Sequence, residues 1–153
     1  MTDAKKPILA ITMGDAAGIG PEIVAKMFVE KKLWMHTSPF VIGDRNIMED
    51  AISLTKVNIS LNPIKAINEA RFKEGTMDIM EVPILKSHKV QKGKVDPRCG
   101  ETSVAYVKLA CQLALDGEIH ATTSAPVNKE AMHAAGYNYE GQTQIFAEMC
   151  NVK

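Results

Sequence analysis

The sequence predicts an α/β fold because short apolar runs alternate with amphipathic segments along the chain. The runs at 7–12 ("PILAIT") and 39–44 ("PFVIGD") have the length of strands, and their nearly continuous apolar character suits strands buried on both faces. Each run is followed by a segment whose apolar residues recur at helical spacing. This alternation is typical of a sheet covered by helices.

The first half of the chain contains two such strand–helix units and the start of a third. After the first run, Pro21 stands where the first residue of a helix is expected, and Glu22 adds a carboxylate to the positive end of that helix. Asp44 is a predicted N-cap for the second helix, which carries apolar residues at 47, 48, 51 and 52. A third strand is expected at 57–61, followed by a short turn or helix at 64–71.

The second half continues the pattern with longer elements. We expect a strand at 77–82, a polar connection at 85–100 and a long helix at about 101–116 that stops at Gly117. A strand at 119–125 follows, and then a helix opened by Pro126 that ends near Gly136. No internal linker is evident, so residues 1–153 are expected to form one α/β portion, and no closing element is predicted before Lys153.

Composition narrows the class of function. The length of 153 residues suits one domain, and 18 basic residues balance 18 acidic ones, so charge gives no reason to expect nucleic acid or a membrane surface as a partner. The three cysteines form no CxxC pair or zinc-type cluster, which favours reduced thiols in the cytoplasm: Cys99, Cys111 and Cys150. The first apolar run breaks at Gly14 and is too short for a signal peptide or a membrane span.

A glycine loop, residues 14–20, joins the first strand to the first helix. Its glycines at 14, 18 and 20 do not match the GxGxxG fingerprint, and Gly20 is not followed by the Lys-Ser/Thr of a Walker A loop. Either the chain turns too tightly for a side chain, or a ligand approaches the backbone. We favour the ligand because the carboxyl end of a strand that leads into a helix is a common anion and cofactor site.

The stretch "TMGDAAGIGPEI" (12–23) resembles the opening of the 4-hydroxythreonine-4-phosphate dehydrogenase family, in particular its relatives that oxidise phosphorylated threonate or erythronate. Three further stretches agree in order and spacing: "GKVDPRCG" (93–100), "TSAPVNKEAMHAAG" (123–136) and "YEGQTQIFAEM" (139–149). The resemblance covers essentially the whole chain. It implies the N-terminal portion of the three-layer fold of isocitrate and isopropylmalate dehydrogenases, which binds its nicotinamide cofactor without the standard fingerprint.

The resemblance also implies an activity. It is the NAD- or NADP-dependent oxidation, with possible decarboxylation, of a phosphorylated small hydroxy acid: 4-hydroxythreonine 4-phosphate, as in pyridoxine biosynthesis, or 4-phospho-threonate or erythronate. A divalent metal such as zinc or magnesium would assist as a Lewis acid, with ligands beyond residue 153, and the full-length enzyme would be a homodimer. The competing hypothesis is a truncated ligand-binding or regulatory module without chemistry.

The resemblance assigns cofactor binding to five residues of the glycine loop: Gly14, Asp15, Gly18, Ile19 and Gly20. Asp15 could equally be a carboxylate that stabilises the turn. Substrate binding is assigned to Lys129, Gln142 and Thr143. The alternative for Lys129 is a side chain that is exposed to solvent and binds no ligand. Gln142 stands where the family usually has histidine, and its neutral amide cannot carry a proton, which leaves the exact substrate open. No catalytic residue is assigned.

The four histidines are scattered, and none is paired at metal-ligand spacing: His36, His88, His120 and His133. We expect surface or structural roles for them and no metal ligand within the chain. Lys94 and Arg98, in the basic connection before the long helix, are expected to be solvated.

Overall fold

The computed structural model describes residues 6–86 and 89–152. Five parallel strands form one sheet in the order β3-β4-β2-β1-β5. The strands are β1 (Ile8–Thr12), β2 (Ser38–Gly43), β3 (Ser60–Ile64), β4 (Thr76–Glu81) and β5 (Ala121–Ser124). The predicted α/β class is confirmed.

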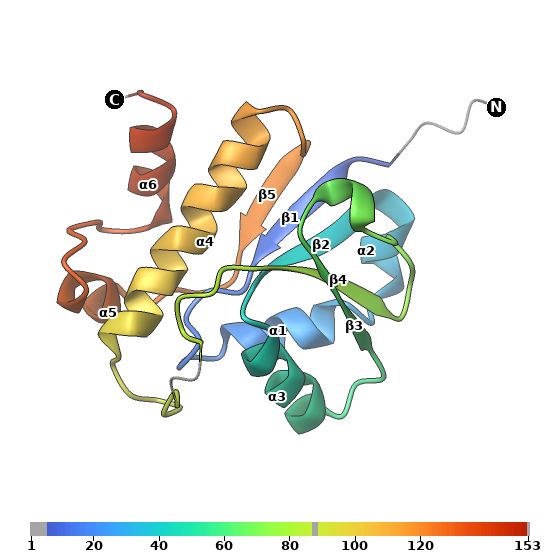
Figure 1. The fold of residues 1–153 in the computed structure, drawn as a ribbon, viewed down its shortest axis with the longest axis horizontal. Helices are drawn as coiled ribbons and strands as arrows, with labels where there is room; N and C mark the ends of the chain where they lie inside the picture. Colours follow the sequence, from blue (N-terminus) through green and yellow to red (C-terminus); the bar gives the residue numbers. More distant parts are fainter. Residues whose placement is uncertain (1–5, 87–88, 153) are drawn as a thin grey trace.

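Six α-helices and one short 3₁₀ helix accompany the strands in the described ranges. They are α1 (Gly20–Met27), α2 (Lys31–His36), α3 (Arg45–Thr55), η1 (Ile67–Glu69), α4 (Pro97–Leu115), α5 (Lys129–Ala134) and α6 (Gln142–Met149). Right-handed crossovers place α1 and α3 on one face of the sheet and α4 on the other, where α4 contacts β1, β2 and β5 (Figure 1). The result is a three-layer arrangement. None of these helices is long and apolar enough to cross a bilayer.

Because all strands are parallel, their carboxyl ends meet at one edge of the sheet, and the loops that follow β1, β2 and β5 gather there. Backbone hydrogen bonds join these loops directly to the neighbouring strands. The Met13 N–H donates to the Ile42 carbonyl at 2.9 Å, and the Ala125 N–H donates to the Thr12 carbonyl at 3.0 Å. The glycine loop is therefore held from both sides at the centre of this edge.

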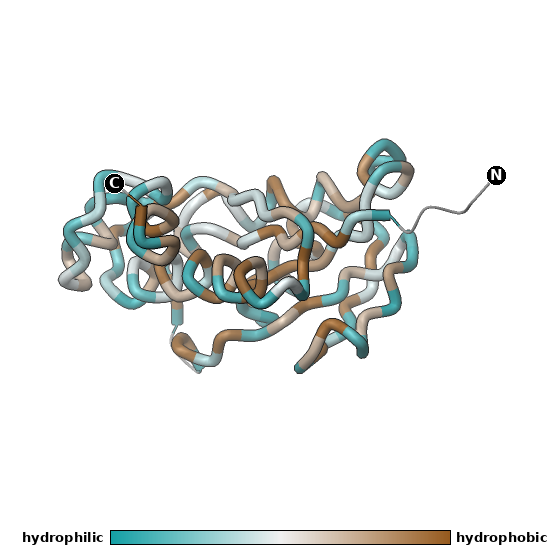
Figure 2. The backbone as a smooth tube through the Cα atoms, turned by 90° about the horizontal axis from the view of Figure 1, so that it is seen from above, coloured by the Kyte–Doolittle hydropathy of each residue, from teal (hydrophilic) through white to brown (hydrophobic). Residues whose placement is uncertain are grey.

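The buried apolar residues form two clusters that meet on α4. The main cluster fills the space around the sheet and includes Tyr106 and Ala110 from α4. The small cluster, formed by Val104, Val107, Met132 and Ile145, lies between α4, α5 and α6. Figure 2 shows that the α5–α6 end of the chain lies at one extremity of the long axis of the molecule.

Several predicted elements differ in position from those observed, and the strand expected at 119–125 is the shorter β5, Ala121–Ser124. The third strand is Ser60–Ile64 rather than 57–61. Helix α4 begins at Pro97 rather than at 101, because the Asp96 carboxylate caps it by accepting a hydrogen bond from the Arg98 N–H at 2.9 Å.

The helix expected to open at Pro126 instead begins three residues later, at Lys129. The side chain of Asn128 is its N-cap and accepts a hydrogen bond from the Ala131 N–H at 3.1 Å. Residues 125–128, named here the 125–128 turn, therefore connect β5 to α5 without being helical.

Helices α2 and α6 were not predicted. The expectation that no element closes the chain was wrong, because α6 follows Gly141. Gly141 has no side chain with which to cap the helix, so the usual start signal is missing, although Ile145, Phe146 and Met149 recur at helical spacing.

Candidate functional site

Gly14 brings the glycine loop into direct backbone contact with the 125–128 turn. Its φ of +77° lies in the left-handed region, and a β-carbon there would stand 2.4 Å from the Pro126 carbonyl oxygen. The neighbouring Asp15 N–H donates to that same oxygen at 3.0 Å. Only glycine fits this position without strain, so the loop after β1 and the loop after β5 form one unit.

The other two glycines of the loop, Gly18 and Gly20, lie in different surroundings. At Gly20 a β-carbon would lie 2.4 Å from the Met13 carbonyl oxygen, so this glycine also serves close packing. Gly18 is half-buried, and the side chain of Ile19 is 64% exposed. The tight-turn explanation therefore applies to Gly14 and Gly20, while Gly18 and Ile19 stay accessible to a ligand.

Asp15 is a buried carboxylate, with 5% of its surface exposed. Burial raises the pKa of this carboxyl, while hydrogen bonds from the Ala17 N–H and from the Asn128 side chain act in the opposite direction. The Ala17 N–H lies 3.0 Å from Oδ1, the geometry of a carboxylate that stabilises its own turn. Asp15 thus links the glycine loop to the cap of α5.

Lys129 is the first residue of α5 and is exposed. No ion pair is formed by its ammonium group with any residue in 6–86 or 89–152. Its position directly after the Asn128 cap places its backbone at the edge of the 125–128 turn. The ammonium group of Lys129 is therefore available to pair with an anionic group bound at this turn.

Gln142 begins α6 and reaches the same turn from the far side. Its Nε2 donates a hydrogen bond to the Ala125 carbonyl at 3.1 Å. Thr143, the next residue, is exposed and makes no side-chain hydrogen bond among those observed in the described ranges. The structure therefore brings Gly14, Asp15 and Gln142 together on the 125–128 turn, with Lys129 adjacent and Thr143 facing solvent.

A cavity of about 710 Å³ flanks the glycine loop on its outer side. Two exposed apolar side chains, Ile19 and Leu54, belong to its wall, and Lys92 is paired with Glu22 at 3.0 Å. The full lining is Ala17, Gly18, Ile19, Glu22, Lys26, Leu54, Thr55, Lys92 and Gly93. The wall therefore combines apolar side chains with the Glu22–Lys92 ion pair and the ammonium group of Lys26.

The described residues do not form a metal centre: no three His, Cys, Asp or Glu side chains converge anywhere in 6–86 or 89–152. His120 accepts a hydrogen bond at Nδ1 from the Ile8 N–H at 3.1 Å, and His133 Nε2 lies 3.1 Å from the Tyr139 carbonyl. His36 is exposed at the end of α2, and His88 lies outside the described residues. Lys94 and Arg98 are exposed.

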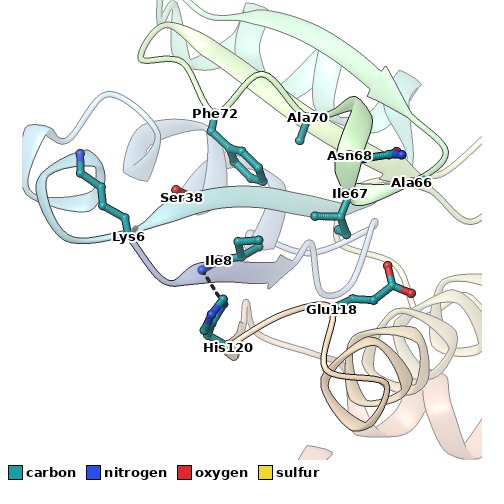
Figure 3. Close-up of a pocket in the computed structure, with 10 residues that line it drawn as sticks. All are labelled: Lys6, Ile8, Ser38, Ala66, Ile67, Asn68, Ala70, Phe72, Glu118 and His120. Carbon is teal, nitrogen blue, oxygen red and sulfur yellow. Dashed lines mark hydrogen bonds between the residues drawn. The ribbon is translucent and has the colours of Figure 1, made fainter. Parts of the chain in front are cut away.

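A second cavity, of about 650 Å³, lies at the opposite edge of the sheet (Figure 3). Its lining includes Ile8 and Ser38, which begin β1 and β2, together with Phe72 and His120. Because these residues mark the amino ends of the strands, the cavity lies across the sheet from the glycine loop. It forms no part of the candidate site.

A parallel sheet whose carboxyl edge carries a glycine loop, an ordered second loop and a nearby cation defines an α/β protein with a candidate ligand site at that edge. A model of the family described as "Pyridoxal phosphate biosynthetic protein PdxA" matches residues 35–153. The chain belongs to this family, which confirms the resemblance found in the sequence motifs and places the chain among dehydrogenase relatives.

Similar proteins extend this assignment over nearly the whole chain. A protein of Symbiobacterium thermophilum named "Putative D-threonate 4-phosphate dehydrogenase" is 38% identical over 144 residues, which are 94% of this chain and 43% of that protein. The crystal structure of a 4-hydroxythreonine-4-phosphate dehydrogenase from Burkholderia phymatum matches with a TM-score of 0.93 and 34% identity, covering 98% of this chain and 45% of that one. The chain therefore spans less than half the length of these relatives.

Sequence reasoning missed two contributors to the site. Asn128 lies within the motif 123–136, but Pro126 carries the stronger local signal for the start of a helix. An asparagine directly before "KEA" is itself an N-cap signal and could have identified it. The second contributor, the Ala125 carbonyl that accepts from Gln142, is a backbone group with no sequence signal.

Proposed function

We propose that this chain contributes part of the substrate and cofactor site of a dehydrogenase that oxidises the secondary alcohol of a phosphorylated small hydroxy acid. The observation that carries the proposal is the meeting of the glycine loop, the 125–128 turn and Gln142 at the carboxyl edge of the sheet. Family membership supports it, since the relatives are named for 4-phospho-threonate and 4-hydroxythreonine 4-phosphate. The activity belongs to the whole protein.

The substrate is bound by three side chains from α5 and α6. The exposed ammonium of Lys129 binds the phosphate or carboxylate of the substrate. One Nε2 hydrogen of Gln142 is donated to the Ala125 carbonyl, so its Oε1 and its second Nε2 hydrogen are the groups that can hydrogen-bond a substrate hydroxyl. The Thr143 hydroxyl, which is exposed beside it, adds a second donor or acceptor.

The neutral amide of Gln142 sets the preferred substrate. A histidine at this position would titrate near pH 6.5 and could donate to an anionic group, whereas glutamine keeps the same reach without a charge. Hydrogen bonds to charged groups contribute about 1.5–3 kcal/mol, against about 1 kcal/mol for neutral pairs. We propose that preference is shifted towards a hydroxy acid without an amino group, such as 4-phospho-threonate or erythronate.

The cofactor in this proposal is NAD or NADP, held beside the glycine loop. Residues 14–20 supply the close backbone approach, with Gly18 and Ile19 accessible, and the cavity between Ile19 and Leu54 accommodates a flat ring. When bound, the nicotinamide supplies the acceptor for the hydride that leaves the substrate carbon. The proposal, following the family resemblance, places the ligands of any divalent metal beyond residue 153; residues 6–86 and 89–152 hold no cluster of three His, Cys, Asp or Glu side chains.

The remaining features of the proposal follow the family. Residues 1–153 act as one N-terminal α/β portion of a cytoplasmic homodimer, with a phosphorylated small molecule rather than nucleic acid or a membrane as the partner. The neutral charge balance supports the absence of a polyanionic partner.

A non-catalytic binding module is the second candidate, and the neutral Gln142 favours it. The test is NADH formation from 4-hydroxythreonine 4-phosphate, 4-phospho-threonate and 4-phospho-erythronate with added zinc or magnesium. We expect little turnover from residues 1–153 alone. We expect metal-dependent turnover from a longer protein in which residues 1–153 are followed by the histidine-bearing C-terminal half found in the family. If neither protein turns over any of the three substrates but both bind them, the result would support the binding module instead.

The role of Gln142 is tested in the same assay with Gln142→His. The proposal predicts that kcat/KM rises for 4-hydroxythreonine 4-phosphate relative to 4-phospho-threonate, and that binding becomes dependent on pH near 6.5. An unchanged substrate ranking and pH profile would show that residue 142 does not set specificity.

A further inference from the structure

Two thiols that are distant in sequence lie next to each other in the fold. Sγ of Cys111, on α4, is 3.8 Å from Sγ of Cys150, which directly follows α6. A disulfide needs a separation of about 2.0 Å, so the two sulfur atoms would have to approach by roughly 2 Å. Neither thiol contacts the glycine loop or the 125–128 turn, and the proposed reaction uses neither.

The two thiols differ in how they can react. Cys111 is buried, with 2% of its surface exposed, and burial raises the pKa of its thiol, with the neighbouring Cys150 raising it further. Cys150 is exposed and is followed by Asn151 in a left-handed conformation (φ 53°), at the end of the described chain. An oxidant in solution therefore reaches Cys150 first.

We propose that Cys111 and Cys150 form a reversible intramolecular disulfide, which makes this pair a redox modification site. With a peroxide as the two-electron oxidant, the Cys150 thiolate attacks one peroxide oxygen; the O–O bond breaks, and Cys150 becomes a sulfenic acid as one water leaves. The Cys111 sulfur then attacks the Cys150 sulfur, an S–S bond forms, and the hydroxyl leaves with the Cys111 proton as a second water. Two thiols and one hydrogen peroxide yield one disulfide and two waters.

The disulfide would tie the far end of the helix that begins with Gln142. Helix α6 is held by Ile145 in the small cluster and by Phe146 and Met149, which pack against that cluster, whereas the disulfide would join its carboxyl end covalently to α4. The closed loop of residues 111–150 contains β5, the 125–128 turn and α5, so oxidation restricts the whole segment that carries Lys129 and Gln142. This consequence for the site rests on the proposed function; the formation of the bond does not.

The experiment uses hydrogen peroxide or oxidised glutathione, followed by alkylation of free thiols and peptide mass spectrometry. We expect a peptide pair joined through Cys111 and Cys150, with loss of two hydrogens, and complete reversal by dithiothreitol. Cys99 serves as an internal control, because it is fully buried and burial raises the pKa of its thiol to about 12; it should remain alkylatable only after unfolding. The melting temperature of the oxidised protein should rise by roughly 5–15 °C.

Cys150→Ser is the matched variant, and it should fold because Cys150 is exposed. It should form no cross-link and show no rise in melting temperature on oxidation. The proposal is overturned if wild type gives only glutathionylated or intermolecular products at Cys150, or if the rise in melting temperature is the same in Cys150→Ser.

Discussion

The sheet region and the α5–α6 region of this chain are built differently. The sheet region has the main cluster on both faces, and backbone hydrogen bonds hold its edge loops. The α5–α6 region is anchored to α4 by a small cluster of Val104, Val107, Met132 and Ile145. The candidate site lies where the two meet: the sheet region supplies the glycine loop, and the α5–α6 region supplies Lys129 and Gln142.

The sheet region therefore serves as a rigid scaffold, and the α5–α6 region carries the residues proposed to bind substrate. Gly14 and Asp15 are fixed by close backbone contacts, so they define where a ligand can lie but tolerate little adjustment. The residues proposed to bind substrate belong to short helices with few buried side chains, and such segments open at lower free energy than a core strand. A substitution at residue 142 should therefore leave the sheet intact.

Among these variants the largest effect is expected for Gly14→Ala, at a close backbone contact between the glycine loop and the 125–128 turn. A left-handed φ and a β-carbon 2.4 Å from the Pro126 oxygen should together lower the free energy of unfolding by about 4 kcal/mol. The control is Gly117→Ala, where φ is +74° but nothing lies within 4 Å, so only about 1–2 kcal/mol should be lost. Equal losses in urea denaturation would show that the contact with the 125–128 turn is not the constraint.

A second effect should be confined to the α5–α6 region. Ile145→Ala removes a fully buried side chain from the small cluster and should cost about 2–3 kcal/mol, mainly as detachment of α6. Met77→Ala, in β4 of the main cluster, should lower the stability of the whole chain instead. Circular dichroism and proteolysis at residues 137–150 distinguish the two; identical proteolytic protection in both variants would contradict the division into regions.

A smaller effect is expected for Asn128→Ala, which removes the cap of α5 and a hydrogen bond to Asp15. The loss should be about 1–2 kcal/mol in thermal or urea unfolding. Asn58→Ala, at an exposed asparagine before β3, is the matched control and should change stability by less than about 0.5 kcal/mol. If the two variants unfold alike, Asn128 does not join the site regions.

The smallest effect concerns Asp15 and has a defined sign with pH. Because the pKa of Asp15 is raised in the folded protein, chiefly by burial, its contribution favours folding below the pKa of the unfolded chain and is lost as pH rises through the folded pKa. Asp15→Asn should therefore melt at or slightly above the wild-type temperature at pH 7, and lose this advantage as the pH falls towards 3. Melting curves from pH 3 to 7 check this, with exposed Asp50→Asn as the control; a gap that widens on acidification would reverse the sign.

Sequence patterns predicted the elements whose signals are local. The apolar runs located β1, β2 and β4, and Asp44 caps α3 as expected by accepting from the Ile47 N–H at 3.1 Å. Contacts between distant segments carry no such signal. The hydrogen bond from Gln142 to Ala125 and the Cys111–Cys150 pair, 39 residues apart, arise only once α6 packs on α4. Helix α6 itself escaped prediction because Gly141 offers no cap.

Hydrogen exchange measured by mass spectrometry, with and without 4-phospho-D-threonate, tests the central claim most directly. Amides of β1 and β2 should exchange only through global unfolding and slow with ligand only as far as the ligand raises global stability, whereas amides in 129–149 should exchange faster in the free protein and gain additional local protection when ligand binds. Uniform exchange over the two regions, or ligand protection confined to the strands, would contradict the division of this chain into a fixed scaffold and an adaptable recognition segment.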